Sequence, residues 1–170
     1  TETDGILSDA TKADLMPEDV DPKTRLRRNT SNHEIDLCTL YGRTHRQTMA
    51  LRLCSETEGQ KGRLKSQLLN GEEYPRFLYP DGGTEPHGDF VDLDPPLGLT
   101  ELPAAQRKTL FAVGGDRVNS TPQTSMLNTL LLREHNRLAG EIEAAHPDWD
   151  DTRVFETARN TVIVIFIKIV

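Results

Sequence analysis

Aromatic residues and cysteines are scarce in this sequence of 170 residues. Only 5% of the residues are aromatic and 35% are hydrophobic, which is little for a domain that folds by itself. The two cysteines, Cys38 and Cys54, stand in neither a CxxC nor a zinc-type spacing, which argues against a redox or zinc motif. Because both lie among apolar residues, we expect buried free thiols. The cysteines therefore indicate neither an oxidising nor a reducing compartment.

The sequence also lacks an excess of positive charge. Its formal net charge is −7, whereas nucleic-acid binding depends on Lys and Arg side chains that neutralise phosphates. We therefore expect no nucleic-acid partner. One basic run, Lys23 to Arg28, is interpreted as a solvated linker, with an anionic docking patch as the alternative.

No segment has the composition of a signal peptide or the length of a transmembrane span. The first ten residues are acidic and have no apolar core. The apolar run Thr161–Val170 has about ten residues, whereas a membrane-spanning helix needs about 20. Since the sequence stops inside this apolar run, we expect that it is cut there.

Generic catalytic and cofactor motifs are missing as well. The sequence has no GxGxxG, no Walker loop, no GxSxG and no HExxH. No two of its histidines have metal-ligand spacing on an expected helix, so each is expected to be a surface or structural residue and no metal ligand is assigned. The five histidines are His33, His45, His87, His135 and His146.

The first two-thirds of the sequence are rich in loops. Residues 1–30 are polar and without periodicity, which predicts a linker or poorly ordered segment. Apolar residues in 35–41 indicate a short buried segment that turns at Gly42, and 44–53 fit a short helix. Residues 56–110 contain many Gly and Pro residues, and no long helix fits between them.

Two long helices are predicted in the last third, so the fold class is mainly α. Thr121 followed by Pro122 is a typical helix start, and His146-Pro147 ends this helix. Its expected apolar stripe consists of Leu127, Leu130, Leu131, Leu138, Ala139 and Ile142.

The second long helix is expected to begin at Asp150 or Asp151. The tail beyond Thr161 is β-branched and could locally form a strand, but the helical period before it favours a helix. The expected buried face consists of Val154, Phe155, Ala158 and Val162.

Several runs in the last 140 residues resemble the animal haem peroxidases, and most closely their cyclooxygenase branch of fatty-acid dioxygenases. The run TLLLREHNRLA at 129–139 resembles a signature helix of that family. EIDLCTLYG at 34–42, LNGEEYPRFL at 69–78 and FAVGG at 111–115 resemble further segments of it. The resemblance covers 31–170 and implies part of a larger all-α haem peroxidase domain, incomplete at both ends.

The resemblance places Arg117 at the position of the family's distal arginine, which implies a catalytic and cofactor-binding role. An arginine is always charged and can stabilise negative charge on an oxygen that leaves a peroxide. The alternative is a loop arginine paired with Asp116. Ser120 stands where some relatives carry a glutamate that forms an ester with haem, so covalent attachment of haem is not expected here.

The resemblance also bears on calcium. The residues aligned with the calcium loop of the mammalian peroxidases are Asn32, Glu34, Asp36 and Cys38. A cysteine is a poor ligand for a hard cation that prefers oxygen, so we do not expect calcium.

Within the signature helix we expect structural roles for Arg133, Glu134 and Asn136. His135 is not the iron ligand in the family. The family's distal histidine lies upstream of 34–42 and its proximal histidine lies downstream of Val170. The resemblance therefore implies a central fragment of a haem b oxidoreductase whose partners are the remainder of its own domain and a peroxide or fatty-acid substrate.

Two alternatives stay open at this stage. The chain could instead be a non-catalytic helical remnant that acts as a protein-interaction module through its apolar helices. Within the enzyme hypothesis, Arg117 favours peroxidase chemistry, whereas the cyclooxygenase-like segments favour a lipid substrate.

Overall fold

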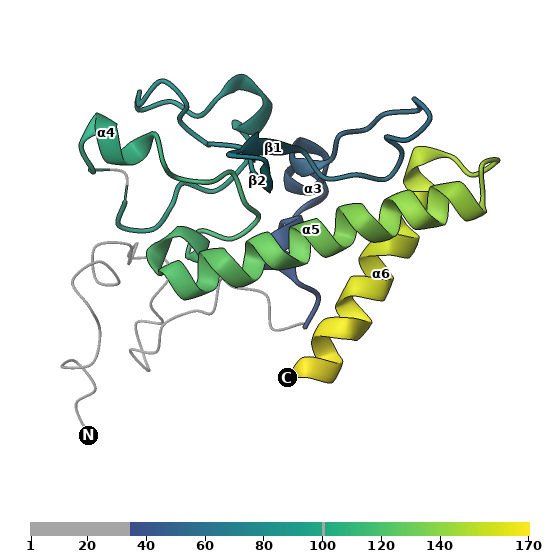
Figure 1. Cartoon of the computed structure of the whole chain (residues 1–170). Helices are drawn as coiled ribbons and strands as arrows, with labels where there is room; N and C mark the ends of the chain where they lie inside the picture. Colours follow the sequence, from purple (N-terminus) through teal and green to yellow (C-terminus); the bar gives the residue numbers. More distant parts are fainter. Residues whose placement is uncertain (1–34, 100) are drawn as a thin grey trace, which may run out of the picture. The chain divides into compact units, whose positions relative to one another are not determined.

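A computed structural model describes residues 35–99 and 101–170, and residues 35–170 form one mainly helical unit (Figure 1). The predicted linker at 1–30 lies outside the described residues, as do His33, Asn32 and Glu34. That part of the domain prediction therefore stays a prediction.

The two long helices predicted from the sequence are confirmed. Helix α5 spans Pro122–Ala145 and helix α6 spans Asp151–Ile169. The side chain of Thr121 accepts a hydrogen bond from Thr124 N, and that of Asp150 accepts one from Arg153 N, so both helices begin at side-chain caps. The β-branched tail is helical, and the predicted buried face of α6 is fully buried at Val154, Phe155, Ala158 and Val162.

The predicted apolar stripe of α5 is only partly right. Leu131 and Ala139 are buried, but Leu127 and Leu130 are 44% and 52% exposed. The helix instead turns a polar set of side chains inward, because the segments that pack on it present backbone groups that need hydrogen-bond partners. The buried polar residues of α5 are Asn128, Thr129, His135, Asn136 and Glu143.

Two short helices precede the irregular region. Helix α2 spans Cys38–Tyr41, and helix α3 spans His45–Leu51 with Thr44 as its cap, which confirms the short helix predicted at 44–53. Ile35 was expected to be buried but is 61% exposed. The expectation of buried thiols is wrong for Cys54, which is free but exposed at a loop position with φ 52°.

The described part of 56–110 contains no long helix, as predicted, but it does contain an unpredicted antiparallel hairpin. Strand β1, Ser66–Leu69, pairs with strand β2, Glu72–Pro75. The turn between them is Asn70-Gly71, both with positive φ (52° and 85°), and this dipeptide is a strong hairpin signal. The other short elements are η2 (Gly88–Phe90), α4 (Ala104–Arg107) and η3 (Val118–Ser120).

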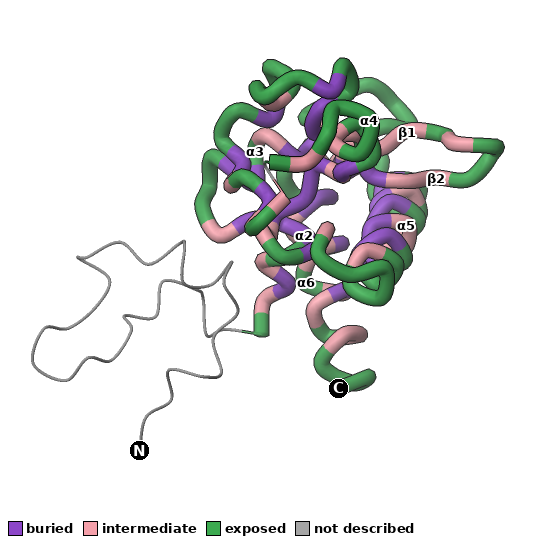
Figure 2. Tube along the Cα trace, turned by 90° about the vertical axis from the view of Figure 1, so that its left-hand side faces the viewer, coloured by how far each residue is buried: buried purple, intermediate pink, exposed green. Residues whose placement is uncertain are grey.

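The core lies between α5, the short helices α2 and α3, and the first half of α6. Its largest buried side chains include Tyr41, Phe90 and Phe155. Buried segments gather along α5 and the chain beside it, whereas the end of α6 extends outward as a mostly exposed tail (Figure 2). No helix among the described residues has the length and hydrophobicity to cross a membrane.

Candidate functional site

His135, in the middle of α5, is fully buried and hydrogen-bonded through both ring nitrogens. Its Nε2 lies 2.8 Å from the carbonyl oxygen of Gly62, and its Nδ1 lies 2.9 Å from the hydroxyl of Tyr41. A carbonyl only accepts, so Nε2 carries the proton and Nδ1 accepts from the tyrosine. Burial, together with the positive charges of Arg52 and Arg159, lowers the pKa of His135 to about 4. The imidazole is therefore neutral near pH 7.

The rest of the signature helix also contacts backbone atoms. Asn136 accepts from Leu64 N at 2.8 Å and donates to Leu64 O at 3.2 Å and to Glu73 Oε1 at 2.7 Å. Arg133 donates from Nε to Glu73 O at 2.6 Å, and Glu134 pairs with Arg137 on the exposed side. These contacts agree with the structural roles expected for Arg133, Glu134 and Asn136.

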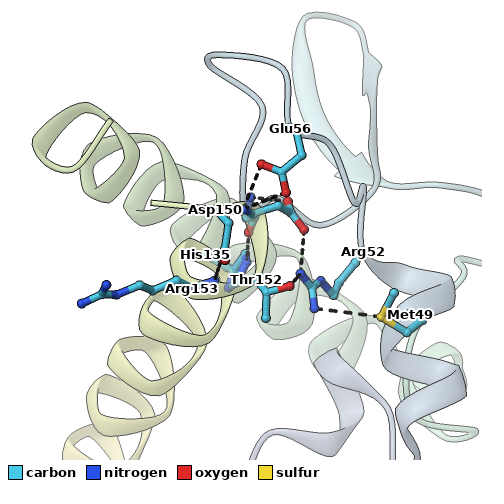
Figure 3. Close-up of polar contacts among 9 residues, drawn as sticks. Met49, Arg52, Glu56, His135, Asp150, Thr152 and Arg153 are labelled. Carbon is cyan, nitrogen blue, oxygen red and sulfur yellow. Dashed lines mark hydrogen bonds and ion pairs between the residues drawn. The ribbon is translucent and has the colours of Figure 1, made fainter. Parts of the chain in front are cut away.

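A buried ion pair, which the sequence did not predict, joins α3 to the start of α6 (Figure 3). Arg52 Nη2 lies 2.6 Å from Asp151 Oδ2, and both side chains are almost fully buried. Asp151 Oδ1 accepts from Gly62 N at 2.7 Å, and Asp151 N donates to the carboxylate of Glu56. The guanidinium also stacks on Phe155, at 4.2 Å from the ring centroid. This network fixes where α6 begins.

Gly62 connects the two networks. It accepts from His135, donates to Asp151 and has φ +69°. A Cβ at this position would lie 2.5 Å from Val154 Cγ1 and 2.7 Å from Phe155 N, too close for any side chain. Only glycine allows the loop to lie directly on α6.

Arg117, the one catalytic residue predicted from the sequence, directly precedes η3 and is exposed. Among residues 35–99 and 101–170 no hydrogen bond or ion pair holds its side chain, so the alternative pairing with Asp116 is not formed. The turn beneath it is fixed. Val118 is buried, and Asn119 accepts from Phe111 N at 2.9 Å and donates to Phe111 O at 3.0 Å. This positioning role of Asn119 was not predicted from the sequence.

The comparison with protein families decides the family of the chain. The family described as animal haem peroxidase matches residues 8–170. The chain belongs to the animal haem peroxidase family. The match begins well before 31, where the resemblance noted from the sequence started.

Individual relatives of this peroxidase-family chain agree with the family match. Prostaglandin G/H synthase 2 of Equus caballus is 33% identical over 138 residues, which cover 81% of this chain and 20% of that protein. Prostaglandin G/H synthase 1 of Canis lupus familiaris is 37% identical with the same coverage. Peroxidase A from Dictyostelium discoideum matches with a TM-score of 0.64 and 31% identity over 81% of this chain and 23% of that one. The chain thus spans about a fifth of the length of the curated relatives, 20% in each.

An animal haem peroxidase holds haem, but the described residues alone do not fit an axial ligand for it. Both nitrogens of His135 are already engaged in the core. His45, His87 and His146 are exposed, and His146 stacks on Trp149 with ring centroids 4.0 Å apart. No described histidine therefore stands in an apolar slot with a free nitrogen.

The residues aligned with the family's calcium loop are only partly described. Asp36 Oδ1 accepts from Cys38 N at 3.0 Å, and Cys38 is half-buried. Within the described ranges no group of three or more His, Cys, Asp or Glu side chains could hold a metal ion.

Proposed function

We propose that this chain is the central portion of a haem-dependent oxidoreductase that reduces peroxides or oxygenates lipids, with haem b as its cofactor. The family match supports the cofactor class, and relatives named as prostaglandin G/H synthases and as a peroxidase support the two reaction types. The observation that carries the proposal is Arg117, an unpaired cation on a fixed turn.

The role proposed for Arg117 follows from its surroundings. Its guanidinium makes no ion pair with any described residue, so it is available to an oxyanion. Asn119 and Val118 fix the backbone of the turn that carries Arg117, while its exposed side chain is free to turn towards a substrate oxygen. A positive charge beside an oxygen that leaves a peroxide stabilises the negative charge that develops on that oxygen.

The remainder of the proposed enzyme must supply the groups that this chain does not. Haem, when bound, would supply the redox chemistry, and residues outside the described ranges would supply its histidine ligand and the acid–base histidine. The partner of this chain is then the remainder of its own domain. Arg117 favours a peroxide as substrate, whereas the prostaglandin G/H synthase relatives favour a lipid.

Substitution of Arg117 in the complete protein tests the proposal. We expect Arg117→Ala to lower the turnover of hydrogen peroxide by about 100- to 1,000-fold, the effect of losing one charge-stabilising donor, with the haem spectrum unchanged. Arg153→Ala is the control, because Arg153 is also exposed but lies on α6. Equal turnover of the two variants would refute the role of Arg117.

A hemin titration of the 170-residue chain tests whether this chain binds haem by itself or needs the remainder of its domain. We expect no saturable one-to-one binding in the Soret region and no peroxidase activity above that of free hemin, because no described histidine is positioned as a ligand. Stoichiometric binding with a histidine-ligated spectrum would contradict this placement of the chain between the haem ligands.

An alternative function is a non-catalytic interaction module. The outer face of α6 favours it, because Val164, Ile167 and Ile169 are each at least half exposed, and apolar patches of this kind bind other proteins. Unchanged peroxidase turnover in the Arg117→Ala variant, together with loss of a partner on replacing Ile167 by Ser, would favour this alternative.

A further inference from the structure

An open depression with a volume of about 490 Å³ lies beside α3 and α6, and Arg117 does not line it. It is bounded by the turn between α2 and α3, by α3 itself and by the first half of α6. Three arginines line it, namely Arg43 in that turn, Arg52 directly after α3 and Arg159 on α6. Nothing in the proposed peroxidase function uses this depression.

Two of these arginines are held against aromatic rings. The guanidinium carbon of Arg52 lies 4.2 Å from the ring centroid of Phe155, and that of Arg159 lies 5.4 Å from that of Tyr41. Stacking fixes the plane of a guanidinium group without using its N–H donors, although Nη2 of Arg52 already donates to Asp151 and Thr152. The two cations are thus oriented before any ligand arrives.

Both stacked arginines have an unused donor. The Nε atoms of Arg52 and Arg159 are buried, and no described residue accepts a hydrogen bond from either. The side chain of Arg52 is only 6% exposed. A buried guanidinium N–H without an acceptor is costly, which calls for an acceptor from outside the described residues.

Of the three arginines that line the depression, Arg159 has the weakest ion pair. Arg43 pairs with Asp94, and Arg52 pairs with Asp151. Arg159 has only Glu156, with its Nη1 3.6 Å from the carboxylate, which is too long for a hydrogen bond.

Two carboxylates, those of Asp36 and Glu156, also line the depression, against the three arginines. Glu156 is the carboxylate that an incoming anion must displace from Arg159. Its side chain is 46% exposed, so it can turn into solvent at little cost. Asp36 already accepts a hydrogen bond from Cys38 N.

We propose that this depression is a binding site for a small oxyanion, a phosphate or a carboxylate group, held by the guanidinium edge of Arg159 and by the single Nε–H of Arg52. Oxyanions of this kind accept two parallel hydrogen bonds from a guanidinium fork, which no lysine can provide. Arg117 does not line this site, and the proposed binding requires no haem.

The Nε–H resonances of arginines in the ¹⁵N-labelled 170-residue chain test this directly. Sodium phosphate and sodium acetate are titrated separately, each against sodium chloride at equal ionic strength. We expect saturable shifts for Arg52 and Arg159 with at least one of the two anions, and the anion that acts identifies the ligand class. Arg153 should not shift. It lies on the same helix and stacks on Trp149 at 4.0 Å, but it is exposed and outside the depression.

Three variants make the test decisive. Arg159→Gln should weaken binding about tenfold or more, the effect of losing a charged hydrogen-bond donor, whereas Arg153→Gln should leave it unchanged. Glu156→Gln should strengthen binding, because the competing carboxylate is gone, and this variant keeps both arginines in a native background. Absence of saturable shifts with both anions, or equal shifts at Arg153, would overturn the proposal, as would weaker binding by Glu156→Gln.

Discussion

The burial of neutral His135 makes the stability of this chain depend on pH. Burial lowers the pKa of His135 from 6.5 to about 4 in the folded state. In the unfolded chain the imidazole takes up a proton near its ordinary pKa of about 6.5. Between these two values the unfolded state binds more protons than the folded state, so the free energy of unfolding falls as the pH falls. Full stability is present above pH 6.5 and is lost progressively towards pH 4.

The size of the effect follows from the two pKa values. Each unit of difference corresponds to about 1.4 kcal/mol, so the interval from 6.5 to about 4 amounts to about 3 kcal/mol of unfolding free energy. The imidazole is fully buried, so solvent does not screen this contribution. Such a loss is a large fraction of the stability of a typical domain.

Urea unfolding at a series of pH values from 8 to 4.5 measures this, with the fluorescence of Trp149 as the signal. The reference is His135→Gln, which keeps one donor and one acceptor at the position but has no proton to gain. Carboxylates titrate in both chains, so the difference between them isolates the histidine.

We expect the wild-type chain to lose stability relative to His135→Gln by about 1.4 kcal/mol per pH unit below 6.5. Tyr41→Phe is the second control. It leaves His135 buried, so it should lower stability at every pH by about 1–3 kcal/mol, the cost of an unsatisfied buried acceptor, without removing the dependence on pH. Parallel curves for the wild-type chain and His135→Gln would refute the reasoning.

Two further substitutions test the networks around this histidine. Gly62→Ala should destabilise the chain by about 1–3 kcal/mol more than Gly59→Ala, because both glycines have positive φ but only Gly62 has atoms in the way of a Cβ; equal melting temperatures for the two variants would contradict the close packing described here. Arg52→Met should cost about 3–5 kcal/mol in urea unfolding, because it leaves the carboxylate of Asp151 buried without its partner. Arg46→Met, at a highly exposed arginine of α3, should cost less than about 0.5 kcal/mol, and a comparable loss in both variants would show that the buried pair contributes little.

The starts and ends of the long helices could be predicted because their signals are local. The side chains of Thr121 and Asp150 each accept a hydrogen bond from the backbone nitrogen three residues later. The signal for each helix start therefore lies within one helical turn of sequence. The inward face of α6 was equally visible, since Val154, Phe155 and Ala158 repeat with the helical period.

The inward face of α5 could not be predicted from hydrophobicity. His135 and Asn136 point inward because the backbone at Gly62 and Leu64 needs partners there, and that need is set by a segment more than 70 residues away in the sequence. The buried pair of Arg52 and Asp151 spans 99 residues and likewise leaves no local pattern.

The hairpin turn and Arg117 differ from these features in the signal that the sequence carries for them. The hairpin turn at Asn70-Gly71 did carry a local signal, which the density of Gly and Pro around it obscured. Arg117 came only from the family resemblance, because a single exposed arginine in a loop carries no local signal of a catalytic role.

The contacts that α5 makes with the preceding loop are largely to main-chain atoms. His135 binds the carbonyl of Gly62, Asn136 binds both backbone groups of Leu64, and Glu143 binds Gly59 N. A helix that recognises peptide groups places few demands on the side chains those residues carry. We therefore expect the loop to tolerate wide sequence divergence at its exposed positions, but not at Gly62 or at Leu64, whose side chain is buried in the core, while its path over α5 stays the same. In this region the polar side chains of α5 determine the path of the loop more than the side chains of the loop do.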